Sequence, residues 1–113
     1  MSVHALTLGT FEADAAAQDV AIITYGASWC GHCLTFAPVF SSISAHYPSV
    51  FFGTVDTESQ PTLAREAGIR SVPTVVLLRH GVVMGRHSGV LTAGALADLA
   101  ESALSAPTSR KIA

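Results

Sequence analysis

Short apolar runs rich in β-branched residues alternate along this chain with segments of helical periodicity, and this alternation limits the chain to a sheet flanked by helices. The run Val20–Ala27 (VAIITYGA) is short and β-branched, which is typical of a buried strand. The order β-α-β-α-β-α-β-β-α predicts an α/β fold with a mixed central β-sheet and helices on both faces. Strands are predicted over Val3–Thr7, Val20–Ala27, Val50–Asp56, Thr74–Arg79 and Val82–His87, and helices over Phe11–Gln18, Gly31–Tyr47, Pro61–Gly68 and the segment after Thr92.

Capping and turn residues set the predicted ends of these elements. Thr10 and Thr92 are candidate N-caps of the first and last helices. Pro61 near the start and Gly68 at the end bracket a short helix. His80–Gly81 separates two strand-like runs and predicts a tight hairpin turn.

Two helices show a clear apolar face, which predicts how they pack on the sheet. Pro38 lies inside the longer one and is expected to kink it, because proline gives no N–H to the helix. The predicted faces are Phe36, Phe40, Ile43 and Tyr47 in the long helix, and Leu96, Leu99, Ala103 and Leu104 in the last helix.

Composition excludes several classes of protein. The chain has 113 residues, which predicts one domain (residues 1–106) and a frayed C-terminal tail (residues 107–113). Half of the residues are apolar and 12% are charged, which excludes a disordered chain. The net charge is −2 without a basic run, so nucleic acid is not an expected partner. No apolar segment approaches the roughly 20 residues of a membrane span and no leader is visible, so we expect a cytoplasmic protein without membrane contact.

The two cysteines form a Cys30-Gly31-His32-Cys33 motif where the second predicted strand meets the long helix. Residues i and i+3 on a first helical turn lie close enough for a disulfide, within the usual ~4.4–6.8 Å between Cα atoms. Unpaired N–H groups and the dipole of the helix N-terminus favour a Cys30 thiolate, the nucleophile of disulfide exchange. Cys33, one turn inside, is predicted to be the more protected, resolving thiol, and Gly31 leaves room for another chain's disulfide. Since structural disulfides are rare inside cells, the pair is predicted to be catalytic or metal-binding.

His32 stands between the cysteines, where its imidazolium can stabilise the Cys30 thiolate and therefore the reduced state. Each tenfold of extra thiolate stabilisation corresponds to about 30 mV in a two-electron couple, so a hundredfold to thousandfold effect raises the potential by roughly 60–90 mV. The motif therefore predicts a couple more oxidising than that of the same two cysteines without this imidazolium.

From residue 3 to residue 105, the chain resembles the thioredoxin family. The resemblance rests on Trp29-Cys30-Gly31-His32-Cys33, Pro38, Val55-Asp56, Gly68-Ile69-Arg70-Ser71-Val72-Pro73-Thr74, Gly81 and Gly89. It implies a thioredoxin fold, a cis bond before Pro73 beside the disulfide, and a substrate groove lined by Trp29, Val72, Pro73 and Gly89. It further implies that Cys30 attacks protein disulfides and that Cys33 resolves the mixed disulfide. The Gly-His pair between the cysteines is similar to that of protein disulfide isomerase domains.

Three positions depart from the family pattern. The buried acid of the family aligns with Thr24, its lysine partner with Thr54, and the lysine that often follows the second cysteine with Leu34. A buried carboxylate can act as a base for the resolving thiol. Without it, Cys33 must lose its proton to water, to His32 or to the substrate, which predicts slower turnover and makes Thr24 a residue that tunes the site.

The expected partners are protein substrates with disulfides or dithiols and an electron donor similar to thioredoxin reductase, with no cofactor besides the redox-active Cys30–Cys33 pair. Two other functions stay open on the sequence. Cys30, His32 and Cys33 could bind zinc or share an iron–sulfur cluster in a dimer, although a structural zinc site takes four ligands. A thioredoxin-like domain that binds peptides without turnover is the other alternative.

Overall fold

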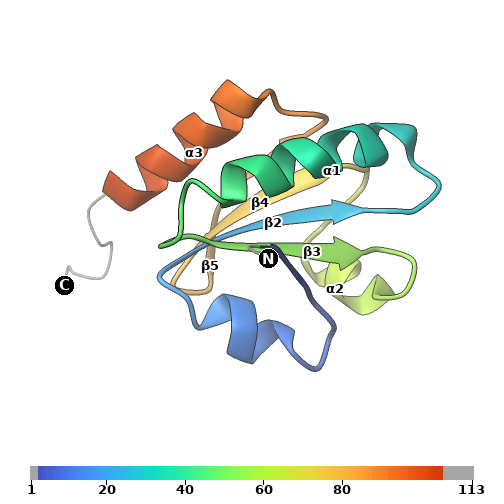
Figure 1. Ribbon diagram of the computed structural model, residues 1–113. Helices are drawn as coiled ribbons and strands as arrows, with labels where there is room; N and C mark the ends of the chain where they lie inside the picture. The colour runs from blue at the N-terminus through green and yellow to red at the C-terminus, as the bar shows by residue number, and fades with distance from the viewer. Residues whose placement is uncertain (1–2, 106–113) are drawn as a thin grey trace.

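The computed structural model describes residues 3–105, so the predicted C-terminal tail lies outside the described residues. Its strands and helices follow the predicted order (Figure 1). In chain order, the elements are β1 (Val3–Ala5), the π-helix η1 (Glu12–Ala16), β2 (Val20–Gly26), α1 (Gly31–Ser44), β3 (Phe51–Asp56), α2 (Pro61–Glu66), β4 (Thr74–Arg79), β5 (Val82–Ser88) and α3 (Ala93–Ser105).

The five strands form one mixed sheet in the order β1-β3-β2-β4-β5. β1, β3 and β2 are parallel, whereas β4 runs antiparallel to both β2 and β5. Helices α1 and α3 cover one face, and η1 and α2 lie on the other (Figure 1). The predicted mixed sheet with helices on both faces is confirmed. Within residues 3–105, no helix is long and apolar enough to cross a membrane.

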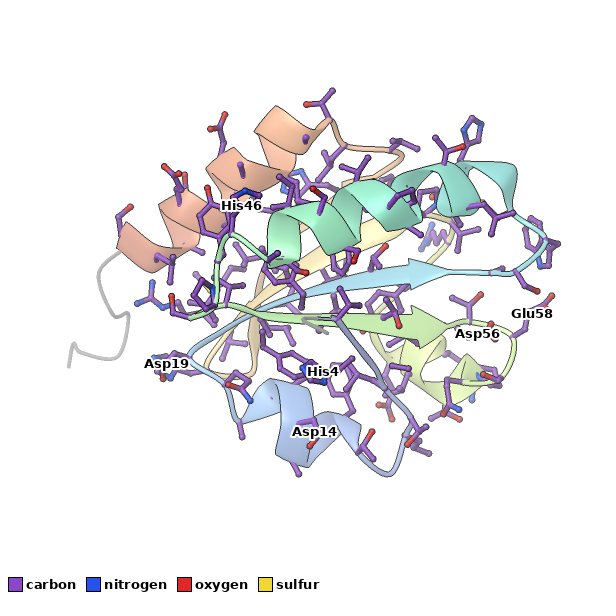
Figure 2. All side chains as sticks on the ribbon, viewed as in Figure 1. His4, Asp14, Asp19, His46, Asp56 and Glu58 are labelled. Carbon is purple, nitrogen blue, oxygen red and sulfur yellow. The ribbon has the colours of Figure 1, made fainter. Side chains whose placement is uncertain are left out.

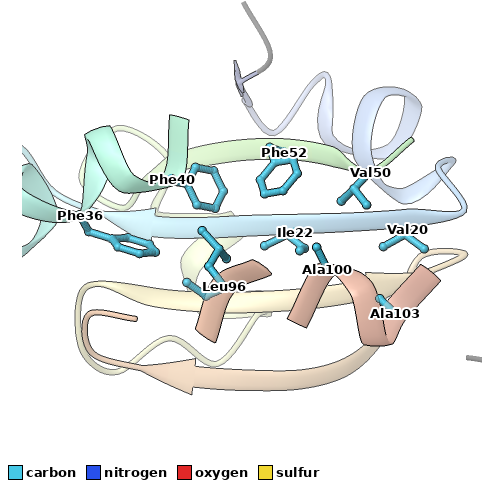
Figure 3. Close-up of a cluster of buried hydrophobic side chains, with 10 residues drawn as sticks. Val20, Ile22, Phe36, Phe40, Val50, Phe52, Leu96, Ala100 and Ala103 are labelled. Carbon is cyan, nitrogen blue, oxygen red and sulfur yellow. The ribbon is translucent and has the colours of Figure 1, made fainter. Parts of the chain in front are cut away.

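Alternation along the central strand β2 divides the core into two clusters. Val20 and Ile22 face α1 and α3, where Phe36 and Phe40 of α1 meet Leu96 of α3 (Figure 3). The intervening residues of β2 point to the other face and pack with η1 and α2. The next two residues of β2 on the α1 side are Thr24, which is polar, and Gly26, which has no side chain. The large side chains of this cluster therefore stop before the end of the strand. Large-side-chain packing on this face therefore ends where α1 begins.

Local signals correctly predicted several element ends. Pro61 begins α2, and Gly68 follows it with a φ of 71°. His80 and Gly81 have φ values of 52° and 81°, the pair of positive angles that a type I′ hairpin turn requires. The Thr92 hydroxyl accepts the Ala95 N–H at 3.0 Å and caps α3.

Other local predictions are wrong. Thr10 does not cap the first helix, because its hydroxyl accepts the Thr7 N–H at 3.0 Å and Phe11 occupies the cap position without a side-chain bond. α1 ends at Ser44, one turn before Tyr47. In α3 the buried face includes Ala100, whereas Leu104 is 40% exposed. A helix that packs on a sheet buries only a narrow stripe of its surface, and here that stripe contains Leu96, Ala100 and Ala103.

Candidate active site

The Cys-x-x-Cys motif lies where the strand β2 gives way to α1. Cys30 is the N-cap residue of α1, with extended backbone angles, and Cys33 lies one turn further on. The backbone N–H of Cys33 donates to Cys30 Sγ at 3.2 Å. This amide is one of the unpaired donors of the helix N-terminus, so it is placed to stabilise a thiolate on Cys30.

The loop before β4 closes over Cys30. The Val72–Pro73 peptide bond is cis, as the resemblance implied, and Cys30 Sγ donates to the Val72 carbonyl oxygen at 3.8 Å. Pro73 is buried, and its carbonyl oxygen accepts the Gly89 N–H at 2.8 Å. Two segments distant in the sequence therefore meet at the nucleophile.

A groove of about 480 Å³ opens beside Cys30. Among the residues predicted to bind substrate, Trp29 and Val72 line this groove, whereas Pro73 and Gly89 do not. The sequence did not single out Thr57, Ala64 or Arg70, although Arg70 belongs to the run that carried the resemblance. The full lining is Trp29, Cys30, Gly31, His32, Thr57, Ala64, Ile69, Arg70, Ser71 and Val72.

Glu58 is a contact of the site that sequence reasoning did not find. Trp29 is 68% exposed, and its indole N–H donates to Glu58 Oε2 at 2.6 Å. The Glu58 N–H in turn donates to Asp56 Oδ1 at 2.9 Å, at the carboxyl end of β3 (Figure 2). A carboxylate from the neighbouring strand end therefore holds the tryptophan ring at the rim of the groove.

Cys33 was predicted to be the more protected of the two cysteines, but it is the more exposed one. Cys30 is buried, with 6% of its surface exposed, whereas Cys33 is partly exposed. The prediction is wrong because the loop at Val72 covers Cys30, whereas Cys33 borders an open cleft. Burial of the Cys33 thiol, followed by its hydrogen bond with Cys30, raises the pKa of Cys33 above its ordinary value. Cys33 is therefore a thiol, not a thiolate, at neutral pH.

A second and larger cleft, of about 560 Å³, reaches Cys33 from the side of β1 and β3. Thr24 and Thr54, the positions of the missing acid and lysine, are partners in the parallel register of β2 and β3, and both line this cleft. Gly26 packs against the sulfur, since a Cβ on it would be 3.1 Å from Cys33 Sγ. Leu34, which stands at the third departing position, is 63% exposed at the rim.

His32 is exposed in the first turn of α1 and lines the groove beside Cys30, and Gly31 is open on its outer side. Within residues 3–105, no group of three or more His, Cys, Asp or Glu side chains is arranged to hold a metal ion. Cys30, His32 and Cys33 lie close together in the sequence but do not form such a group.

Comparison with known proteins agrees with this geometry. The family model named Thioredoxin matches residues 2–102. The chain belongs to the thioredoxin family. It is 37% identical over 94 residues to "Putative thioredoxin 2" of Streptomyces coelicolor, which covers 83% of this chain and 70% of that protein. It is 39% identical over 70 residues to "Thioredoxin C-3" of Corynebacterium nephridii, covering 62% of this chain but only 48% of that protein.

Solved structures lead to the same family. A mutant thioredoxin from Halobacterium salinarum NRC-1 superposes with a TM-score of 0.87 at 25% identity, covering 95% of each chain. The thioredoxin fold is therefore confirmed, and family membership indicates a disulfide oxidoreductase in general.

Proposed function

We propose that this thioredoxin-family protein exchanges disulfides with protein substrates, with Cys30 as the nucleophile and Cys33 as the resolving thiol. The observation that carries the proposal is the Cys33 N–H bond to Cys30 Sγ at the N-terminus of α1. Cys30 attacks a substrate disulfide and forms a mixed disulfide while one substrate sulfur leaves as a thiolate. Cys33 then loses its proton, attacks Cys30 Sγ and releases the second substrate thiolate.

The groove supports a protein segment as substrate. Trp29 and Val72 line it together with Cys30, and Trp29 is largely exposed. An extended segment that carries a disulfide can lie in this groove with one of its sulfurs against Cys30. An electron donor similar to thioredoxin reductase would use the same groove to return the Cys30–Cys33 disulfide to the dithiol.

Cysteine variants test this assignment. Cys30→Ser should abolish reduction of a protein disulfide such as that of insulin, and Cys33→Ser should trap a mixed disulfide on Cys30 that gel electrophoresis without reductant detects. The matched control is Ser28→Ala, an exposed residue just before the motif, which should keep full activity. Full activity of Cys30→Ser would instead support the domain that binds peptides without turnover. Zinc or iron in untagged protein, lost in Cys30→Ser, would support the metal alternative.

We propose that His32 makes this couple more oxidising than that of an ordinary thioredoxin. His32 is exposed and lines the groove beside Cys30, so its imidazolium can act on the thiolate through space. His32→Pro should lower the reduction potential by roughly 60–90 mV, measured by equilibration with a glutathione couple and alkylation. His32→Gln keeps a polar side chain without the charge and should give most of the same decrease. An unchanged potential in both variants would contradict the role of the imidazolium.

A further inference from the structure

The cleft behind Cys33 is separate from the substrate groove. Cys33 lines the cleft and Cys30 does not, whereas Cys30 lines the groove and Cys33 does not. The two sulfurs therefore open to different sides of the first turn of α1. A molecule in the cleft reaches the second cysteine without passing the bound protein substrate.

Small side chains make this access possible. Gly26 leaves open the space against Cys33 Sγ that any Cβ would occupy at 3.1 Å. Thr24 and Thr54 line the floor, and Ala37, one turn after Cys33 on the same side of α1, lines the wall. The cleft volume of about 560 Å³ lies within the range of about 300–1,000 Å³ that small-molecule sites have.

The chemistry of the disulfide favours attack from this side. Exchange is faster when the departing sulfur is the better leaving group, and it depends on which sulfur can be reached. Attack on Cys33 Sγ expels Cys30, whose thiolate receives the Cys33 N–H at the helix N-terminus. Attack on Cys30 Sγ expels Cys33, whose pKa is raised by burial, so it is the poorer leaving group.

We propose that a small cationic aminothiol reduces the oxidised protein through this cleft by attacking Cys33 Sγ. This proposal rests on the proposed function and names a second electron donor for the same disulfide. The thiolate of the aminothiol forms a bond to Cys33 Sγ, the Cys30–Cys33 bond breaks, and Cys30 leaves as the thiolate. A second aminothiol attacks the mixed disulfide at the sulfur of the first, and Cys33 leaves and takes up a proton. The two aminothiols depart as their disulfide, so they are oxidised by the two electrons that reduce the protein.

Charge in the cleft sets the class of thiol. Among the described residues that line it, Asp56 and Cys33 alone are ionisable, and Asp56 is an exposed carboxylate at the carboxyl end of β3 (Figure 2). One of its oxygens accepts the Glu58 N–H, and the other remains for an ammonium group. The rest of the lining is apolar or carries hydroxyls, as at Thr24 and Thr54. An anionic thiol has no partner of opposite charge in this lining.

The test uses three small thiols on the oxidised full chain: cysteamine, which is cationic, 2-mercaptoethanol, which is neutral, and 3-mercaptopropionate, which is anionic. Each rate is divided by that of the same thiolate with a small exposed disulfide, so that only the effect of the protein remains. Cysteamine should give the largest ratio. Acid quenching, alkylation and peptide mapping should place cysteamine on Cys33 and the alkyl group on Cys30. The reverse placement would overturn the proposal.

Variants in the cleft complete the test. Ala37→Leu fills the wall beside Cys33 and should slow reduction by cysteamine about tenfold, because access decides which sulfur is attacked. Ala95→Leu, at an exposed position of α3 away from the cleft, is the matched control and should have no effect. Asp56→Asn should lower the preference for cysteamine about twofold to fivefold, the size of an exposed ion pair. Equal rates in Ala37→Leu and the control would refute entry through the cleft.

The two proposals fail in distinguishable ways. Reduced wild-type protein and reduced Ala37→Leu should both form the first mixed disulfide with insulin at the same rate, since the groove at Cys30 is untouched. Loss of insulin reduction in the wild type would refute the proposed function. Intact insulin reduction with cysteamine mapped to Cys30 would refute the cleft proposal alone.

Discussion

Restoring a carboxylate behind the resolving thiol should speed the second half of disulfide exchange. Thr24 lies on β2 and lines the same cleft as Cys33. Because burial keeps the pKa of Cys33 above its ordinary value, we expect proton loss to limit its attack at neutral pH. Thr24→Asp adds a base of nearly the same volume in a cleft that is already open. Well-aligned general bases accelerate a reaction about 100-fold to 10,000-fold, and a base that acts across a wet cleft should accelerate it at least about tenfold.

The assay separates the two thiols in one experiment. Reduced protein mixed with an aromatic disulfide such as 5,5′-dithiobis(2-nitrobenzoate) releases one coloured thiolate when Cys30 attacks and a second when Cys33 resolves the mixed disulfide. Thr24→Asp should accelerate the second phase and leave the first unchanged. Thr24→Asn, which has the same shape without a base, is the control. Equal second phases in the two variants would refute the reasoning, as would a matching change in both phases.

Stability gives an independent readout of the same carboxylate. Thr24 is only partly exposed, so burial should raise the pKa of a carboxyl group introduced there above that of the unfolded chain. A group with a raised pKa favours folding below its unfolded pKa and loses that contribution as the pH rises through the folded value. Thr24→Asp should therefore be less stable than Thr24→Asn by about 1–3 kcal/mol at neutral pH, and the difference should vanish in acid.

Two further predictions concern the groove and the core. Glu58→Gln removes the carboxylate that accepts the Trp29 indole N–H. The fluorescence of this single tryptophan should shift and become easier to quench with acrylamide, while the melting temperature stays unchanged. Identical quenching would show that Glu58 does not hold the ring. Burial raises the pKa of Tyr25 to about 12, so wild-type stability should be full below pH 10 and fall as the pH rises toward 12. Tyr25→Phe should remove this fall in urea unfolding, and a retained fall would assign it to another group.

The sequence predicted best what a few adjacent residues decide. The turn at His80–Gly81 needs two positive φ angles, and the N-cap at Thr92 needs one hydroxyl within reach of an amide three residues on. The motif from Cys30 to Cys33 is likewise local, because a strand end and a helix start place both sulfurs on one turn. Such features depend on neighbours in the chain, which the sequence displays directly.

The sequence failed where the outcome depends on several distant elements. The exposure of Cys33 is decided by β2 and β3, whose small residues Gly26 and Thr54 leave the sulfur open. Cys30 is covered by the loop at Val72, more than 40 positions along the chain. The bond between Trp29 and Glu58 likewise joins two strand ends. Spacing along the chain cannot show which side chains meet across a sheet.

Replacement of the family's acid has two physical consequences that follow from one change. Thr24 and Thr54 stand where the resemblance places the acid and its lysine partner, so we expect Cys33 to lack a base, and both threonines line the open cleft. We expect the first consequence to slow release of a protein substrate through the groove, and we propose that the second admits a small thiol to the other sulfur. Thr24→Asp and Ala37→Leu separate these consequences, because one supplies the base and the other closes the wall. If the two effects are independent, the fold change in each rate of the double variant should equal the product of the fold changes in the two single variants.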